Sequence, residues 1–325
     1  MQMKVPLSLR AIYDTRVEIY TRLKGQVDDA VAGLKEKRWH YESRVKSLES
    51  FALKIESGRF SPPEQLEDFF ACTLVVENAA SIAEAERRIK SRFPADLNRR
   101  PPDDTKTAKR ADSFPFDDLR LYPKWSAGSS RPDLSIEGLR FEIQVKTFLQ
   151  HAWTIATHEL VYKADEISWA KRRIAYQIKA MLEHAEVSIT EAGPLSKTPS
   201  LRKIDKRTDE LIKLTAAIKK LFTIDQLPRD IIRLVENTWD LLQATNTSLD
   251  ELRRAVTKET SEGRGIRLVN LSPFGILLQS LGNVHPDRVT AFLQSPHARY
   301  RMLLPQELSM PVPASGLVPD RLLRL

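Results

Sequence analysis

The chain has 325 residues, of which 42% are hydrophobic and 29% charged, a composition typical of a globular protein with a sizeable core. Its single cysteine, Cys72, excludes an intrachain disulfide framework, and no apolar run approaches the ~20 residues that a membrane-spanning helix needs. The net charge of +8 favours polyanionic partners such as nucleotides or RNA. We therefore expect a cytoplasmic protein without membrane contact, in which Cys72 is a buried core thiol.

The first half of the chain predicts a mixture of helices and strands. One or two helices are predicted at residues 8–37, and further helices at 47–59 and 79–93, where apolar residues recur at roughly helical spacing. Strands are predicted at residues 38–47 and 71–76, and the segments 119–125 and 139–147 are predicted to pair as an antiparallel hairpin. Residues 94–118 predict a loop of unusual length, which in a compact domain is usually functional or disordered.

From residue 148 the pattern is mainly helical. One apolar stripe consists of Ile174, Ile178, Met181, Ala185 and Ile189, and further helices are predicted at 200–222, 228–245, 271–281 and 285–295. Pro228 suits a helix start, residues 258–265 predict a flexible break, and the tail 310–325 is expected to pack loosely. This order favours an α+β fold, with a mixed β-sheet flanked by helices at residues 1–195 and a helical C-terminal region at 196–325.

Three separated segments place polar side chains beside the predicted sheet. The segment SRVKSLES carries Arg44, Lys46, Ser47 and Ser50, Asp68 stands just before a buried strand, and the strand FEIQVKT alternates Glu142, Gln144 and Lys146 on one face. Two carboxylates on neighbouring strands can share Mg²⁺, while arginine and lysine can hold phosphate oxygens. A solvated strand face, or a cap in the case of Asp68, is the alternative explanation.

These segments resemble the synthetase domain of the RelA/SpoT family, which includes the small alarmone synthetases and their toxic relatives. The resemblance covers about residues 40–165 and rests on RVKSLESF, on EDFFACTLVV, and on EIQVKT followed by HAWTIATHELVYK. Proteins of this family move the β,γ-pyrophosphate of ATP onto the 3′-hydroxyl of an acceptor nucleotide. Their fold is a mixed sheet flanked by helices, related to nucleotidyltransferases. The resemblance therefore implies an enzyme with ATP as pyrophosphate donor and Mg²⁺ as cofactor.

The resemblance also implies roles for individual positions. Asp68 and Glu142 would bind Mg²⁺ and act in catalysis. The residues implied to hold ATP are Arg44, Lys46, Ser47, Ser50, Lys109 and Arg110. Those implied to meet the acceptor or its phosphates are Phe116, Gln144, Lys146, His158, Tyr162 and Lys163. A purely structural role remains open for His158, Tyr162 and Lys163, and Trp153 is expected in the core.

The chain departs from the family pattern where the acceptor is recognised. The family loop usually has the form Gly-Tyr-x-Ser-x-His, but here PFDDLRLY puts Phe116 in place of the tyrosine and changes the hydrogen-bonding groups. Ala71 and Thr73 stand where a glycine and an arginine are usual. Phe116 can still stack on a base, because stacking needs only a π-face.

These changes leave several functions open. The acceptor could be a guanine nucleotide, giving (p)ppGpp, or the 3′ end of tRNA or an adenine nucleotide, as in toxic relatives. A catalytically degenerate nucleotide- or RNA-binding protein is the alternative. The dipeptide His-Asp does not occur, so the hydrolase domain of bifunctional members is not expected. Residues 196–325 are candidates for regulation, oligomerisation or the binding of an antitoxin or other regulatory protein, or form a structural addition.

Overall fold

A computed structural model describes residues 3–58, 66–94, 96–103, 105–107, 110–111, 114, 118–127, 133–161, 167–263, 271–296, 301–318 and 322–324, with the backbone alone for 158–161 and 324. The chain divides into two compact units, Met1–Leu201 and Arg202–Leu325. The predicted domain boundary after residue 195 falls at the end of the short helix α6 (Ala192–Leu195). No described helix is long and apolar enough to cross a membrane.

The first unit is built on a mixed five-stranded sheet with the strand order β1-β2-β5-β4-β3. The strands are β1 (His40–Val45), β2 (Phe70–Val76), β3 (Asn98–Arg100), β4 (Leu119–Tyr122) and β5 (Glu142–Thr147). β2 and β5 are parallel, and the other neighbours are antiparallel. The predicted α+β class with a mixed sheet is confirmed, and so is the antiparallel pairing of the segments that contain β4 and β5.

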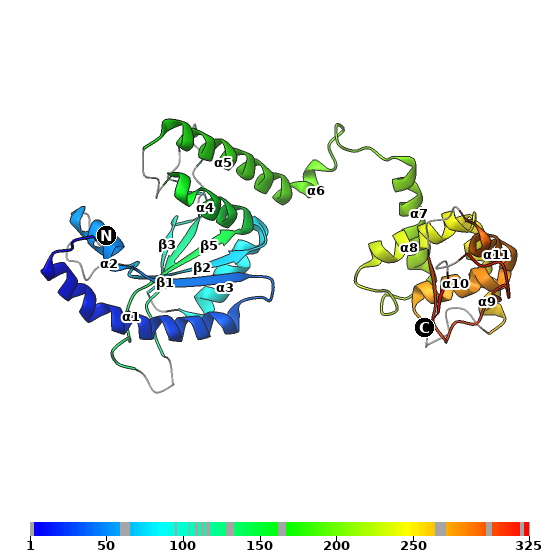
Figure 1. The fold of residues 1–325 in the computed structure, drawn as a ribbon, viewed down its shortest axis with the longest axis horizontal. Coiled ribbons are helices and arrows are strands. Elements are labelled where there is room, and N and C mark those ends of the chain that lie inside the picture. Colours follow the sequence, from blue (N-terminus) through cyan, green and yellow to red (C-terminus); the bar gives the residue numbers. More distant parts are fainter. Residues whose placement is uncertain are drawn as a thin grey trace. The chain divides into compact units, whose positions relative to one another are not determined.

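Helices cover both faces of this sheet (Figure 1). α1 (Leu7–Leu34) and α3 (Ile82–Arg92) lie on one side, and α4 (Phe148–Val161) and α5 (Trp169–Thr190) lie on the other, while α2 (Leu48–Glu56) follows β1. α1 is a single helix, where the sequence left one or two open. A 3₁₀ turn, η2 (Ala79–Ser81), precedes α3.

The hydrophobic core of the unit lies between the sheet and the pair α1 and α3. Leu23 and Val27 of α1, Ile89 of α3, and Leu74 and Val145 of the sheet are fully or almost fully buried in it. Since side chains alternate along a strand, this burial turns the intervening residues toward the opposite face. Cys72 is buried in this core as predicted, and burial raises the pKa of its thiol to about 12.

A buried carboxylate attaches α5 to the rest of the unit. Glu186 is 8% exposed and accepts hydrogen bonds from the backbone N–H of Ala79 at 2.7 Å and the hydroxyl of Thr147 at 2.7 Å. Trp153 of α4 packs beneath α5 as expected for a core residue, and its indole N–H donates to the carbonyl of Ala175. The predicted apolar stripe of α5 is instead largely exposed, as at Met181 (71%).

The second unit is a helical bundle with its own core. Its helices are α7 (Lys206–Leu221), α8 (Ile231–Ala244), α9 (Leu249–Ser261), α10 (Pro273–Val284) and α11 (Pro286–Gln294). Residues such as Ile218, Leu241, Leu252 and Leu281 are completely buried in it. Side-chain caps begin α7, α8, α9 and α10, among them a complete capping box between Ser248 and Glu251, whereas α11 starts with a proline and has no side-chain cap.

Four local predictions are wrong. The long loop 94–118 contains β3, and the break predicted from residue 258 is helical as far as Ser261 in α9. α8 begins at Ile231 with Asp230 as its N-cap, so Pro228 precedes the helix. The tail contributes β7 (Leu322–Arg324), which pairs in parallel with β6 (Met302–Leu304). Pairing partners distant in sequence decide both short strands, and local patterns do not reveal them.

The substitution Glu186→Gln should loosen α5 locally. The amide keeps the shape but has only one acceptor oxygen, so a buried donor loses its partner at a cost of about 1–3 kcal/mol. Hydrogen exchange of the α5 amides should accelerate accordingly. Glu191→Gln, an exposed change at the end of the same helix, is the matched control. Equal protection in both variants would contradict the anchoring role of Glu186.

Candidate functional site

The face of the sheet that points toward α4 is polar. Strand pairing places Arg44 opposite Ala71, and Ala71 opposite Glu142; next to them, Thr73 lies opposite Gln144. All these side chains share one face, because pairing partners on adjacent strands point to the same side. We call this surface the polar face. It confirms the predicted alternation along FEIQVKT, with Glu142, Gln144 and Lys146 on one side of β5.

A cavity of about 200 Å³ opens on the polar face. Its lining consists of Glu42, Ser43, Arg44, Ala71, Thr73, Gln144, Lys146 and Thr154, and we call it the sheet cavity. Three segments far apart in sequence therefore meet here: β1, β2, and β5 with the helix that follows it. Ala71 and Thr73, which stand where a glycine and an arginine are usual in the family pattern, form part of the wall.

Two cations of the sheet cavity, Arg44 and Lys146, form no ion pair with a described residue. Among the described residues, the Lys146 ammonium has one hydrogen-bond partner, the Thr154 hydroxyl at 3.5 Å. Burial lowers the pKa of Lys146, an effect that Asp118 opposes and Arg120 reinforces. Unpaired cations around a polar cavity are suited to anionic ligands such as phosphate.

Asp68 lies just before β2 and receives two lysines. Its Oδ2 atom is 3.1 Å from Nζ of Lys46 and 2.5 Å from Nζ of Lys54. Burial would raise the pKa of Asp68, but Lys54 and Lys46 together outweigh burial and hold it below its usual value. The other carboxylate oxygen, Oδ1, is buried without a hydrogen-bond partner. Asp68 is therefore an ionised group with one unused ligand atom.

Glu142, the first residue of β5, is 4% exposed and is held by its neighbours on the polar face. Gln144 donates to its Oε1, and the hydroxyl of Tyr122 hydrogen-bonds to it as well. Burial and the Glu142 charge raise the pKa of Tyr122 to about 12. Arg120 lies beside this group and forms an ion pair with Asp118 at 3.3 Å. A buried carboxylate in such a network has a well-defined orientation.

Ser47 and Ser50 have a structural role. Ser47 is the N-cap of α2, where its hydroxyl accepts from the backbone N–H of Ser50 at 3.3 Å and donates to the Ser50 hydroxyl at 3.0 Å. Together with the salt bridges from Lys46 and Lys54 to Asp68, this cap places the start of α2 beside Asp68. Contact of either serine with a ligand stays a prediction.

The remaining predicted residues are those expected to meet the acceptor and the two ATP contacts predicted in the long loop, Lys109 and Arg110. Arg110 is exposed, and the backbone of His158 belongs to α4. Lys109, Phe116, Tyr162, Lys163 and the side chain of His158 lie outside the described residues. Their roles stay predictions.

No protein-family model matches the chain, and no curated protein matches it. Solved structures similar to it include the small alarmone synthetase 1 from Bacillus subtilis, at 14% identity and a TM-score of 0.45, covering 57% of this chain and 98% of that chain. Another is a GTP pyrophosphokinase family protein from Streptococcus pneumoniae, at 18% identity and a TM-score of 0.39. The match covers 59% of this chain and 95% of that chain. A third is the complex of the type VI effector Tas1 with its immunity protein, at 14% identity and a TM-score of 0.34. The match covers 56% of this chain and 100% of that chain.

The structure adds residues that the sequence analysis did not single out. Lys54 lies on α2, and its partner Asp68 is distant in sequence, so no local signal marks it. Glu42 precedes Arg44 by two residues on β1, and strand alternation alone puts both on the same face. Thr154 and His151 have no such signal, because their proximity to β1 depends on how α4 packs.

The carboxylates differ in how well they suit Mg²⁺. Asp68 fits as a ligand, because Oδ1 is a buried carboxylate oxygen that lacks a hydrogen-bond partner. Glu142 supplies the right atom type, but Gln144 and Tyr122 already engage it. No hydrogen bond joins the two carboxylates in the described part of the chain.

Lys54→Met should raise the pKa of Asp68, since it removes the shorter of the two lysine contacts. Because the folded pKa of Asp68 is depressed, its contribution to stability is present above the unfolded value near ~3.9 and is lost as the pH falls through the folded value. The variant should lose this contribution at a higher pH. Titration of the Asp68 carboxyl carbon by NMR measures the shift, with Lys24→Met, whose lysine pairs with Asp28 instead, as control. An unchanged midpoint would exclude the proposed pairing.

Proposed function

We propose that this protein is an ATP-dependent pyrophosphokinase, which transfers the β,γ-pyrophosphate of ATP to the 3′-hydroxyl of a guanine nucleotide. The observation that carries the proposal is the placement of two cations, Arg44 and Lys146, in the lining of a polar cavity of about 200 Å³, where neither forms an ion pair with a described residue. Such cations favour an anionic ligand, and the motifs that provide these residues resemble those of the RelA/SpoT synthetases.

The donor phosphates would bind at the β1 side of the polar face. Arg44 and Lys146 would contact phosphate oxygens directly, and Lys46 and Lys54 would share their charge between Asp68 and the phosphates. Asp68 would hold Mg²⁺, with Glu142 as a second candidate ligand. When bound, Mg²⁺ would neutralise charge on the phosphate oxygens.

The reaction requires one bond to form and one to break. The acceptor oxygen attacks the β-phosphorus of ATP, the bond from that phosphorus to the oxygen bridging the α-phosphate breaks, and AMP leaves with the bridging oxygen. Glu142 would accept the hydroxyl proton, because Gln144 and Tyr122 orient its buried carboxylate. The other residues would hold the attacking and leaving oxygens in line.

Acceptor identity depends on parts of the chain beyond the sheet cavity. Phe116, His158, Tyr162 and Lys163 remain the predicted contacts, with stacking of Phe116 on guanine as the central one. The 3′ end of tRNA and adenine nucleotides are the competing acceptors, and the net charge of +8 suits tRNA as well. A role of residues 196–325 in restraining the enzyme, in oligomerisation or in binding an antitoxin stays a prediction.

Labelled ATP tests the reaction. Full-length protein with Mg²⁺ and ATP labelled in the γ-phosphate should transfer label to GDP or GTP. Glu142→Gln should lower the rate by about 10²- to 10⁴-fold, the usual cost of losing a general base. Asp68→Asn should also lose activity, and Glu18→Gln, an exposed change on α1, should not.

Each other outcome of this assay changes the conclusion. Label on tRNA, or in an adenine nucleotide that has gained a 3′-pyrophosphate, with none on GDP or GTP, would retain the pyrophosphokinase activity. It would overturn the guanine nucleotide as acceptor. Transfer unaffected by Glu142→Gln would overturn the role of Glu142. If no label reached any acceptor, the proposed enzymatic activity would be overturned, and a nucleotide-binding protein would be favoured.

Lys146→Met should weaken ATP binding about 10- to 100-fold, since a charge-assisted hydrogen bond contributes about 1.5–3 kcal/mol. Calorimetry with a non-hydrolysable ATP analogue measures the change. Lys37→Met removes an exposed lysine just before β1 and should leave the affinity unchanged. Equal affinities for the two variants would remove Lys146 from the donor site.

A further inference from the structure

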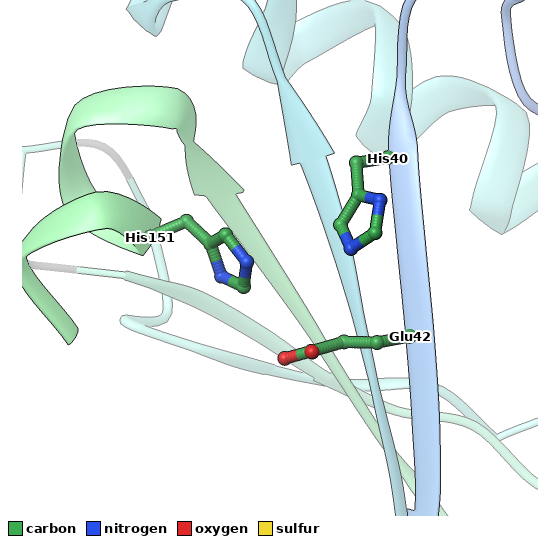
Figure 2. Close-up of side chains that lie close together, drawn as sticks. All are labelled: His40, Glu42 and His151. Atoms are coloured by element: carbon green, nitrogen blue, oxygen red, sulfur yellow. The ribbon is translucent and has the colours of Figure 1, made fainter. Parts of the chain in front are cut away.

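Two histidines and a glutamate converge at one end of the polar face. His40 and Glu42 lie on β1, and His151 lies in the first turns of α4. One potential ligand atom from each residue lies within 4.8 Å of the other two, and the centroids of the two imidazole rings are 5.6 Å apart. Figure 2 shows the two rings and the carboxylate directed toward the same small space. We call this set the His/Glu cluster.

Local structure places the backbone of each member so that its side chain faces the other two. His40 and Glu42 are two residues apart on one strand, so both project from the same face. His151 is positioned by the start of α4, where Thr147 and Gln150 exchange hydrogen bonds: the Gln150 side chain accepts from the Thr147 N–H at 3.0 Å, and the Gln150 N–H donates to the Thr147 hydroxyl at 3.2 Å. His151 itself is only 8% exposed.

The His/Glu cluster has no partners of its own in the described part of the chain. There, the side chains of His40, Glu42 and His151 form no hydrogen bond and no ion pair, either with one another or with other residues. His40 and Glu42 are exposed and His151 is buried, so the three side chains converge at a site that a ligand from solvent can reach. Glu42 adds a negative charge, which favours a cation over an anion at this point.

We propose that the His/Glu cluster binds a divalent transition-metal ion of the Zn²⁺ type, with His40, Glu42 and His151 as its three protein ligands. Two imidazoles and a carboxylate are a common ligand set for such ions, whereas Mg²⁺ prefers oxygen ligands alone. Tetrahedral Zn²⁺ with bonds of about 2.0–2.1 Å needs ligand atoms roughly 3.4 Å apart, so small side-chain rotations would close the present separation.

This site is separate from the Mg²⁺ site of the proposed function, because neither Asp68 nor Glu142 belongs to it. The two sites are nevertheless neighbours, since Glu42 also lines the sheet cavity. A bound ion would connect β1 to the first turns of α4 and add positive charge at the edge of that cavity. The nearby ammonium of Lys146 opposes the ion, and the Glu42 carboxylate offsets part of that repulsion.

Zn²⁺ binding to the full-length, untagged protein tests the proposal without any nucleotide. Competition with a chromogenic chelator should show one tightly bound Zn²⁺ per chain. His40→Ala and His151→Ala should each weaken Zn²⁺ binding by more than about 100-fold. Loss of a residue that only supports a metal ligand costs less, about 10- to 100-fold. Glu42→Gln should weaken Zn²⁺ binding as well while keeping the side-chain volume. His184→Ala removes an exposed histidine of α5 outside the cluster and should change nothing.

Two outcomes would overturn the site: no tight Zn²⁺ on the wild-type protein, or Zn²⁺ that remains equally tight in Glu42→Gln and both alanine variants. Displacement of Zn²⁺ by a moderate excess of Mg²⁺ would also overturn it, because that would indicate an all-oxygen site. Circular dichroism verifies that each variant is folded. If a histidine variant is unfolded, the Zn²⁺ affinity of Glu42→Gln decides whether the cluster binds the ion. The outcome is independent of pyrophosphate transfer, so failure of either proposal is recognised separately.

Discussion

The parallel pairing of β2 with β5, extended by the antiparallel β1, is the constraint on which the rest of the first unit depends. Its register aligns Ala71 with Glu142 and Thr73 with Gln144, and β1 adds Arg44 to the same row. A slip of one residue in β5 would turn Glu142, Gln144 and Lys146 into the core and Val145 out of it. The apolar contacts with α1 and α3 thus determine where the candidate active site lies.

Charge on the polar face is distributed unevenly, and this unevenness gives the site its chemistry. The carboxylates of Asp68 and Glu142 are engaged by lysines and by hydrogen-bond donors, whereas Arg44 and Lys146 have no anionic partner in the described part of the chain. An anionic ligand would complete these contacts rather than disrupt existing ones. The His/Glu cluster beside them combines a carboxylate with two imidazoles, and these side chains form no hydrogen bond or ion pair in the described part of the chain.

Several site features were predictable because they follow from short-range periodicity. Alternation along β5 placed Glu142, Gln144 and Lys146 on one face, and the structure bears this out. Ser47 and Ser50 were also picked out, yet they engage each other as the cap of α2. Capping and ligand binding use the same hydroxyl groups, so a sequence pattern does not separate them. Lys54 was missed because its partner, Asp68, is distant in sequence.

The sequence by itself determined the alternation of the strands, the mixed α+β order, the helical second half and the chemical kinds of residue available for binding phosphate. These depend on repeats of two or a few residues, which any window of the chain contains. Only the tertiary structure decided the short strands β3 and β7, the exposure of the α5 stripe, the Lys46–Asp68–Lys54 contact and the meeting of His40 and Glu42 with His151. Each of these joins segments that are neighbours only in the fold, through packing that no local pattern encodes.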